Sequence, residues 1–170
     1  MTQSWRHLPA PARPIAAAAV AAVSAARQRD DEALAEAARD LAVLDPALVG
    51  LIVGTAVRLL LEDTHPEGLD GDDIRNVLER CVRSAAQWQP DVDPHVVLIL
   101  LAGALGVHDD GEAPPEPDVL ARHAALLMAD LLDDTPAPGS AFGASGEVEE
   151  PIAGCLTRAL GEIERAQLDD

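Results

Sequence analysis

Apolar residues recur three and four positions apart along almost the whole chain, and no segment alternates apolar and polar residues with the period of two typical of a half-buried strand. The apolar residues are mostly Ala, Leu and Val, whereas aromatic residues make up only 2% of the chain. Small side chains allow helices to approach closely, while sheets are enriched in β-branched and aromatic residues. The sequence therefore predicts an all-α protein, a single-domain bundle of about seven helices.

Two of the predicted helices are apolar on every side. Each follows an Asp-Pro pair, Asp45-Pro46 or Asp93-Pro94, in which Asp can cap the helix and Pro can occupy its first position. A helix that is apolar on all sides is normally buried. We therefore expect the helices at about 46–62 and 94–107 to be central, surrounded by amphipathic helices.

The chain divides into four segments by composition. Residues 1–13 are expected to form an extended, Pro-containing arm. Residues 14–134 carry the helical periodicity of a core domain, and residues 135–147 are rich in Pro, Gly, Ala and Ser, as is typical of a flexible linker. The helix expected at 148–168 is thus tethered, and it packs either on its own core or on a partner.

The strongly acidic charge limits the possible partners. The net charge is −18, and all twelve basic residues are Arg. Because such a field repels phosphate backbones, no nucleic-acid binding is expected. The apolar runs at 46–57 and 96–107 are shorter than the roughly 20 residues that a membrane span requires, so no membrane association is expected.

The cysteine pattern and the N-terminal region favour a cytoplasmic protein. Cys81 and Cys155 lie far apart and match no metal-binding spacing. Near the N-terminus, Pro9, Pro11 and Pro14 precede a weakly hydrophobic, Ala-dominated run at 15–26, and both features are unlike a signal peptide. We expect both thiols to be reduced and buried.

Four residues in two acidic loops are the candidate metal ligands. His65 and Glu67 lie in one loop, and His108 and Asp109 lie in the other. If the two loops converged, this set would suit zinc, manganese or iron. Solvated loop tips explain the same residues more simply, so neither a metal nor any other cofactor is predicted. No nucleophile elbow or phosphate-binding glycine loop occurs, and no catalytic residue is assigned.

Small residues also recur at helical spacing within the two apolar helices. Gly50 and Gly54 lie four residues apart, as do Ala102 and Gly106. This spacing predicts that the two helices cross with their backbones close together. For the same reason, an Ala-rich core argues against a large internal cavity.

The leading functional hypothesis is a non-catalytic module that binds a protein partner or a second copy of itself. Trp5 and Leu8, in the N-terminal arm, are its candidate anchors. One alternative is a small-molecule-binding bundle, with Met128 and Trp88 among the cavity-lining residues, which requires an apolar pocket above about 300 Å³. The other alternative is a metal-dependent enzyme with its site at the 62–67 and 107–112 loops.

Overall fold

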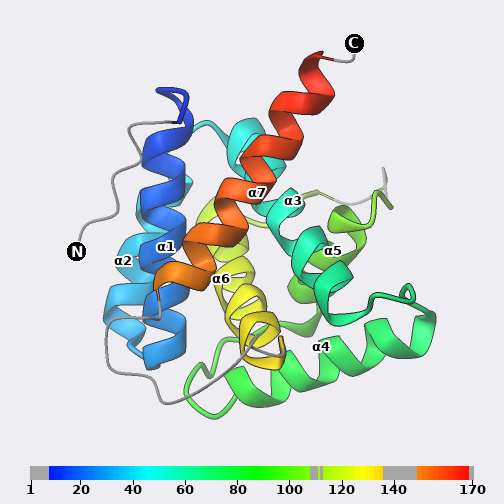
Figure 1. Cartoon of the computed structure of the whole chain (residues 1–170). Coiled ribbons are helices and arrows are strands. Elements are labelled where there is room, and N and C mark those ends of the chain that lie inside the picture. The colour runs from blue at the N-terminus through cyan, green and yellow to red at the C-terminus, as the bar shows by residue number, and fades with distance from the viewer. Residues whose placement is uncertain (1–7, 108–110, 112, 136–148, 169–170) are drawn as a thin grey trace.

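The computed structural model describes residues 8–107, 111, 113–135 and 149–168. Within these residues the chain forms seven α-helices and no strand, as Figure 1 shows. The helices are α1 (Ala12–Gln28), α2 (Asp31–Ala42), α3 (Pro46–Thr64), α4 (Gly71–Ala85), α5 (Pro94–Ala104), α6 (Pro117–Asp134) and α7 (Glu149–Leu168). The predicted all-α bundle is confirmed.

Most helix starts are fixed by an Asp side chain. Asp45 Oδ1 accepts hydrogen bonds of 2.9 and 3.1 Å from the backbone N–H groups of Ala47 and Leu48. Asp70 and Asp73 form a capping box at the start of α4. These bonds satisfy amides that have no partner within the helix, and they explain why α3 begins at Pro46 and α4 at Gly71.

The most enclosed helix is α6. It packs against α1, α2, α3, α4 and α5, and in Figure 1 it lies in the middle of the molecule, behind α7. Its residues 123–129 are all buried. The short α1–α2 connection makes these two helices neighbours, and both pack on α6.

The structure differs from the expectation that the helix at 94–107 is central. Helix α5 packs on α3, α4 and α6, but Leu98 on the helix and Leu105, its C-cap residue, are 43% and 36% exposed. The two leucines are seven residues apart and therefore lie on one face. Within the described residues, this apolar helix therefore stands partly at the surface.

Helix α7 packs across α1 and α3 of its own chain. Its buried face includes Ile152, Leu156 and Ala159, each fully buried. On the rim of this contact, Arg158 makes a bidentate ion pair with Asp63 at 2.6 and 3.1 Å. The connection predicted as a flexible linker, 135–147, lies almost entirely outside the described residues.

Among the described residues, no helix combines the length and the apolar character that crossing a bilayer demands.

Candidate functional site

A cavity of about 470 Å³ lies between α1, α2, α3, α5 and α6 and the segment that leads into α6. Every residue that lines it is Gly, Ala, Pro, Val, Leu, Ile or Met. The lining residues are Ala19, Ala22, Val23, Leu41, Ala42, Leu44, Pro46, Val49, Gly50, Val53, Gly54, Val57, Ile99, Leu100, Gly103, Ala104, Pro114, Pro115, Pro117, Leu120, Ala121, Ala124, Ala125 and Met128. A cavity without polar side chains offers a ligand apolar contact and no directional hydrogen bond from a side chain.

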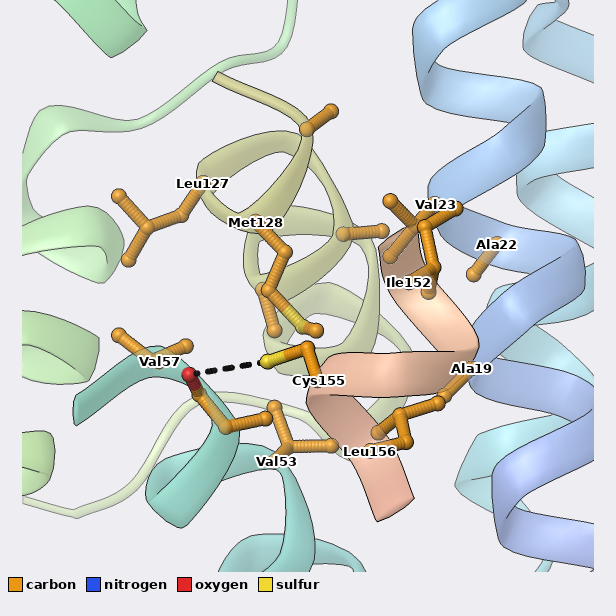
Figure 2. Packing of buried hydrophobic residues seen from close by; sticks show 14 of the residues in the cluster. Ala19, Ala22, Val23, Val53, Val57, Leu127, Met128, Ile152, Cys155 and Leu156 are labelled. Carbon is orange, nitrogen blue, oxygen red and sulfur yellow. Dashed lines mark hydrogen bonds between the residues drawn. The ribbon is translucent and has the colours of Figure 1, made fainter. Parts of the chain in front are cut away.

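The floor of the cavity is part of the protein's main core. Ala19, Val23, Val53 and Met128 line it and are buried. Figure 2 shows these side chains in the same cluster as Ile152, Cys155 and Leu156 of α7. Helix α7 therefore packs against the same core that forms the floor of the cavity.

The mouth of the cavity consists of the five lining residues that are exposed. They come from four places in the fold: Pro46 and Gly50 on α3, Gly103 on α5, Pro114 in the segment before α6, and Pro117 at the start of α6. The mouth therefore lies where α3 and α6 begin and α5 ends.

Three helical glycines keep the cavity open. A Cβ atom built on Gly50, Gly54 or Gly103 would have no neighbouring heavy atom within 4 Å. The prediction that small residues bring α3 and α5 into close contact is therefore wrong at Gly50 and Gly54. The space above these glycines belongs to the cavity, and larger side chains would project into it.

The expectation that an Ala-rich core leaves no large cavity is also wrong. The volume lies within the roughly 300–1,000 Å³ range of small-molecule sites. It is about three times that of a 150 Å³ apolar cavity known to bind one benzene molecule. Three of the helices around it also pack on helices that do not line it: α3 on α7, and α5 and α6 on α4.

The proposed metal ligands do not form a site within the described residues. His65 ends α3, where its Nδ1 lies 2.8 Å from Thr64 Oγ1 and 3.2 Å from the carbonyl oxygen of Leu61. Glu62, three residues before His65, instead binds Arg58 at 2.8 Å. The described part of the chain holds no group of three or more His, Cys, Asp or Glu side chains suited to a metal.

The remaining candidate residues are placed as follows. Glu67 is exposed in the α3–α4 loop. Leu8 is buried in the chain's own core, with 6% of its surface exposed. His108, Asp109 and Trp5 lie outside the described residues.

Neither cysteine is suited to nucleophilic chemistry. Burial raises the pKa of the Cys81 thiol to about 12 and that of the Cys155 thiol to about 11. Cys155 Sγ lies 3.6 Å from the carbonyl oxygen of Ala56, to which it donates (Figure 2). A nucleophilic cysteine needs a lowered pKa and access to solvent, and these two have neither.

A second, much smaller pocket of about 60 Å³ lies between α1, α4 and α6. Trp88 lines this pocket and does not line the large cavity. Beside it, Arg27 pairs with Asp133 at 2.9 Å, and Arg80 pairs with Asp130 at 2.9 Å. These ion pairs join helices, and the volume suits no more than a water or two.

Comparison of the chain with protein-family models, curated proteins and solved structures finds no match. The geometry of the cavity is therefore the basis for assigning a function. Of the two lining residues that the sequence suggested, Met128 lines the cavity and Trp88 does not. Sequence reasoning missed the other lining residues, although one signal was present. A glycine inside a helix lowers the stability of the helix by about 1 kcal/mol relative to Ala. The presence of Gly50, Gly54 and Gly103 within helices therefore indicates that something other than helix stability favours the lack of a side chain at these positions.

Proposed function

We propose that this protein binds a small apolar molecule in the cavity between α1, α2, α3, α5 and α6. The observation that carries the proposal is a lining made only of apolar residues around about 470 Å³, with a mouth at the surface. Filling such a space with water leaves the water without polar side-chain partners, whereas an apolar ligand gains about 0.8 kcal/mol for each buried methylene. In this proposal the protein holds or carries the ligand and catalyses no reaction.

The ligand is expected to contain about 15–20 non-hydrogen atoms, because the cavity has about three times the volume that accommodates one benzene. N-phenyl-1-naphthylamine is a suitable probe, since it is uncharged, has three aromatic rings and fluoresces strongly in apolar surroundings. We expect one probe molecule to bind per chain with an increase in fluorescence.

Gly54→Leu tests whether the probe occupies this cavity. A leucine at this position projects into open space beside Val53 and Val57, and should weaken probe binding about tenfold or more by filling the site. Gly154→Leu is the matched control, because Gly154 is also helical, is equally free of neighbours and lies outside the cavity on α7. Equal probe affinity in the two variants, or no binding by the unmodified protein, would refute the proposal.

A protein-interaction module is the second candidate, favoured by exposed apolar side chains that adjoin cavity-lining residues in sequence. Val43 is 83% exposed and Leu51 is 44% exposed; each adjoins a cavity-lining residue in sequence, Ala42 or Gly50. Native mass spectrometry of the protein purified gently from its host separates the candidates. A small ligand bound to one chain supports the first proposal, and a second chain or a partner protein supports the second.

A further inference from the structure

Carboxylates adjoin the mouth of the cavity on two sides. Asp45 directly precedes Pro46, while Glu116 and Asp118 flank Pro117. Asp45 and Glu116 are exposed, and Asp118 is half-buried. No Arg or His within the described residues is directly adjacent in sequence to any of the five mouth residues.

The helix ends at the mouth do not neutralise these carboxylates. Helices α3 and α6 begin there and α5 ends there, and each helix end contributes only about half an elementary charge. The positive ends of α3 and α6 are partly cancelled by the negative end of α5. Because three full carboxylate charges stand against this small remainder, the mouth has a negative potential.

The backbone amides at the mouth are also poorly placed to bind an anion. The first position of both α3 and α6 is a proline, which has no N–H. The next two amides of α3, those of Ala47 and Leu48, already donate to Asp45. The usual reason for a helix N-terminus to attract an anion is therefore removed at α3.

We infer that the cavity selects an amphiphile with an apolar body and a cationic end, the body lying among the apolar lining residues and the cation at the acidic mouth. This inference rests on the proposed function, which supplies the apolar half of the ligand. The net charge of −18 acts in the same direction, because it attracts cationic molecules and repels anionic ones over a longer range. The same charges disfavour fatty-acid-like ligands.

Three probes of equal chain length test the charge preference: n-decylamine, n-decanol and n-decanoate, each used to displace N-phenyl-1-naphthylamine. At an ionic strength of about 0.01 M, where the Debye length is about 30 Å, we expect the amine to bind about tenfold more tightly than the carboxylate, with the alcohol in between. The difference should shrink at about 0.15 M, because salt screens charges at an exposed mouth.

The double variant Glu116→Gln, Asp118→Asn should reduce the preference for the amine several-fold. Glu116 makes no side-chain capping bond, so its neutralisation leaves the start of α6 intact. The control is Asp91→Asn, Glu164→Gln, which changes the net charge equally at two exposed positions away from the mouth. The control should keep the preference.

The outcomes separate this inference from the proposed function. If decanol displaces the dye but the amine and the carboxylate bind equally, the cavity is a binding site and the cationic preference is wrong. The same conclusion follows if both double variants lower the preference equally, because the effect then comes from net charge and not from the mouth. If none of the three probes displaces the dye, the proposed function itself fails.

Discussion

Nε2 of His123, on α6, accepts a hydrogen bond of 2.9 Å from the backbone N–H of Asp93, the residue that caps α5. On the other side of the ring, Nδ1 lies 2.8 Å from the carbonyl oxygen of Val119, to which it donates. Both ring nitrogens are therefore satisfied, and the imidazole is neutral with its proton on Nδ1. The side chain joins the start of α5 to the central helix.

This arrangement predicts that the protein loses stability in mild acid. Burial lowers the pKa of His123, an effect that the nearby Arg122 reinforces and that the Val119 carbonyl and Asp93 oppose. The folded state therefore binds fewer protons than the unfolded state as the pH falls below about 6.5, the ordinary pKa of His. The free energy of unfolding should be at its full value above that pH and decrease as the pH falls toward the lowered pKa.

Urea unfolding of the wild type and of His123→Gln, measured between about pH 5 and pH 8, checks this prediction. Glutamine can donate and accept hydrogen bonds but does not titrate, so the variant should lose about 1 kcal/mol at pH 8. Its stability should also depend less on pH below about 6.5. The same slope in both proteins would show that other groups cause the acid sensitivity.

The helices could be predicted from the sequence because their signals are local. Asp45 and Asp93 cap helices at the positions that their Asp-Pro pairs predict. The helical periodicity between them depends only on residues a few positions apart. The start of α1 at Ala12, two residues before Pro14, shows the usual uncertainty of a helix boundary.

The cavity could not be predicted because it depends on how distant helices are placed. Gly50 and Gly54 indicate only that side chains are absent along one side of α3. Whether a neighbouring helix or open space lies there depends on where α5 and α6 are held by their other contacts. The exposed face of α5, with Leu98 and Leu105, was missed for the same reason.

The docking of α7 is predicted to depend on its apolar face more than on its ion pairs. Leu156 is fully buried, so Leu156→Ala should cost about 2–5 kcal/mol by removing contacts and leaving a cavity. Arg158 is 52% exposed where it pairs with Asp63, and surface ion pairs contribute at most about 1 kcal/mol. Arg158→Ala should therefore be much milder.

Urea unfolding of the two α7 variants gives the comparison, and hydrogen exchange identifies the region affected. Amides of α7 should exchange faster in Leu156→Ala, while those of α2 and α4, which make no comparable contact with α7, should change less. A larger loss in Arg158→Ala than in Leu156→Ala would mean that the ion pair with Asp63 is the principal attachment of α7.

The glycines of the cavity are predicted to lower the stability of the folded protein. Each of Gly50→Ala and Gly54→Ala should raise the free energy of unfolding by about 0.5–1 kcal/mol, because alanine is the better helix former and its Cβ meets no neighbour. Gly154→Ala in α7 should give a similar gain. Only the first two add an atom inside the cavity, so only they should weaken binding of N-phenyl-1-naphthylamine.

Thermal unfolding and dye titration of the three variants measure both effects. Loss of stability in Gly54→Ala would mean that the space above α3 is filled, whereas a gain in stability with weaker dye binding would mean that helix stability is given up there to keep the site open.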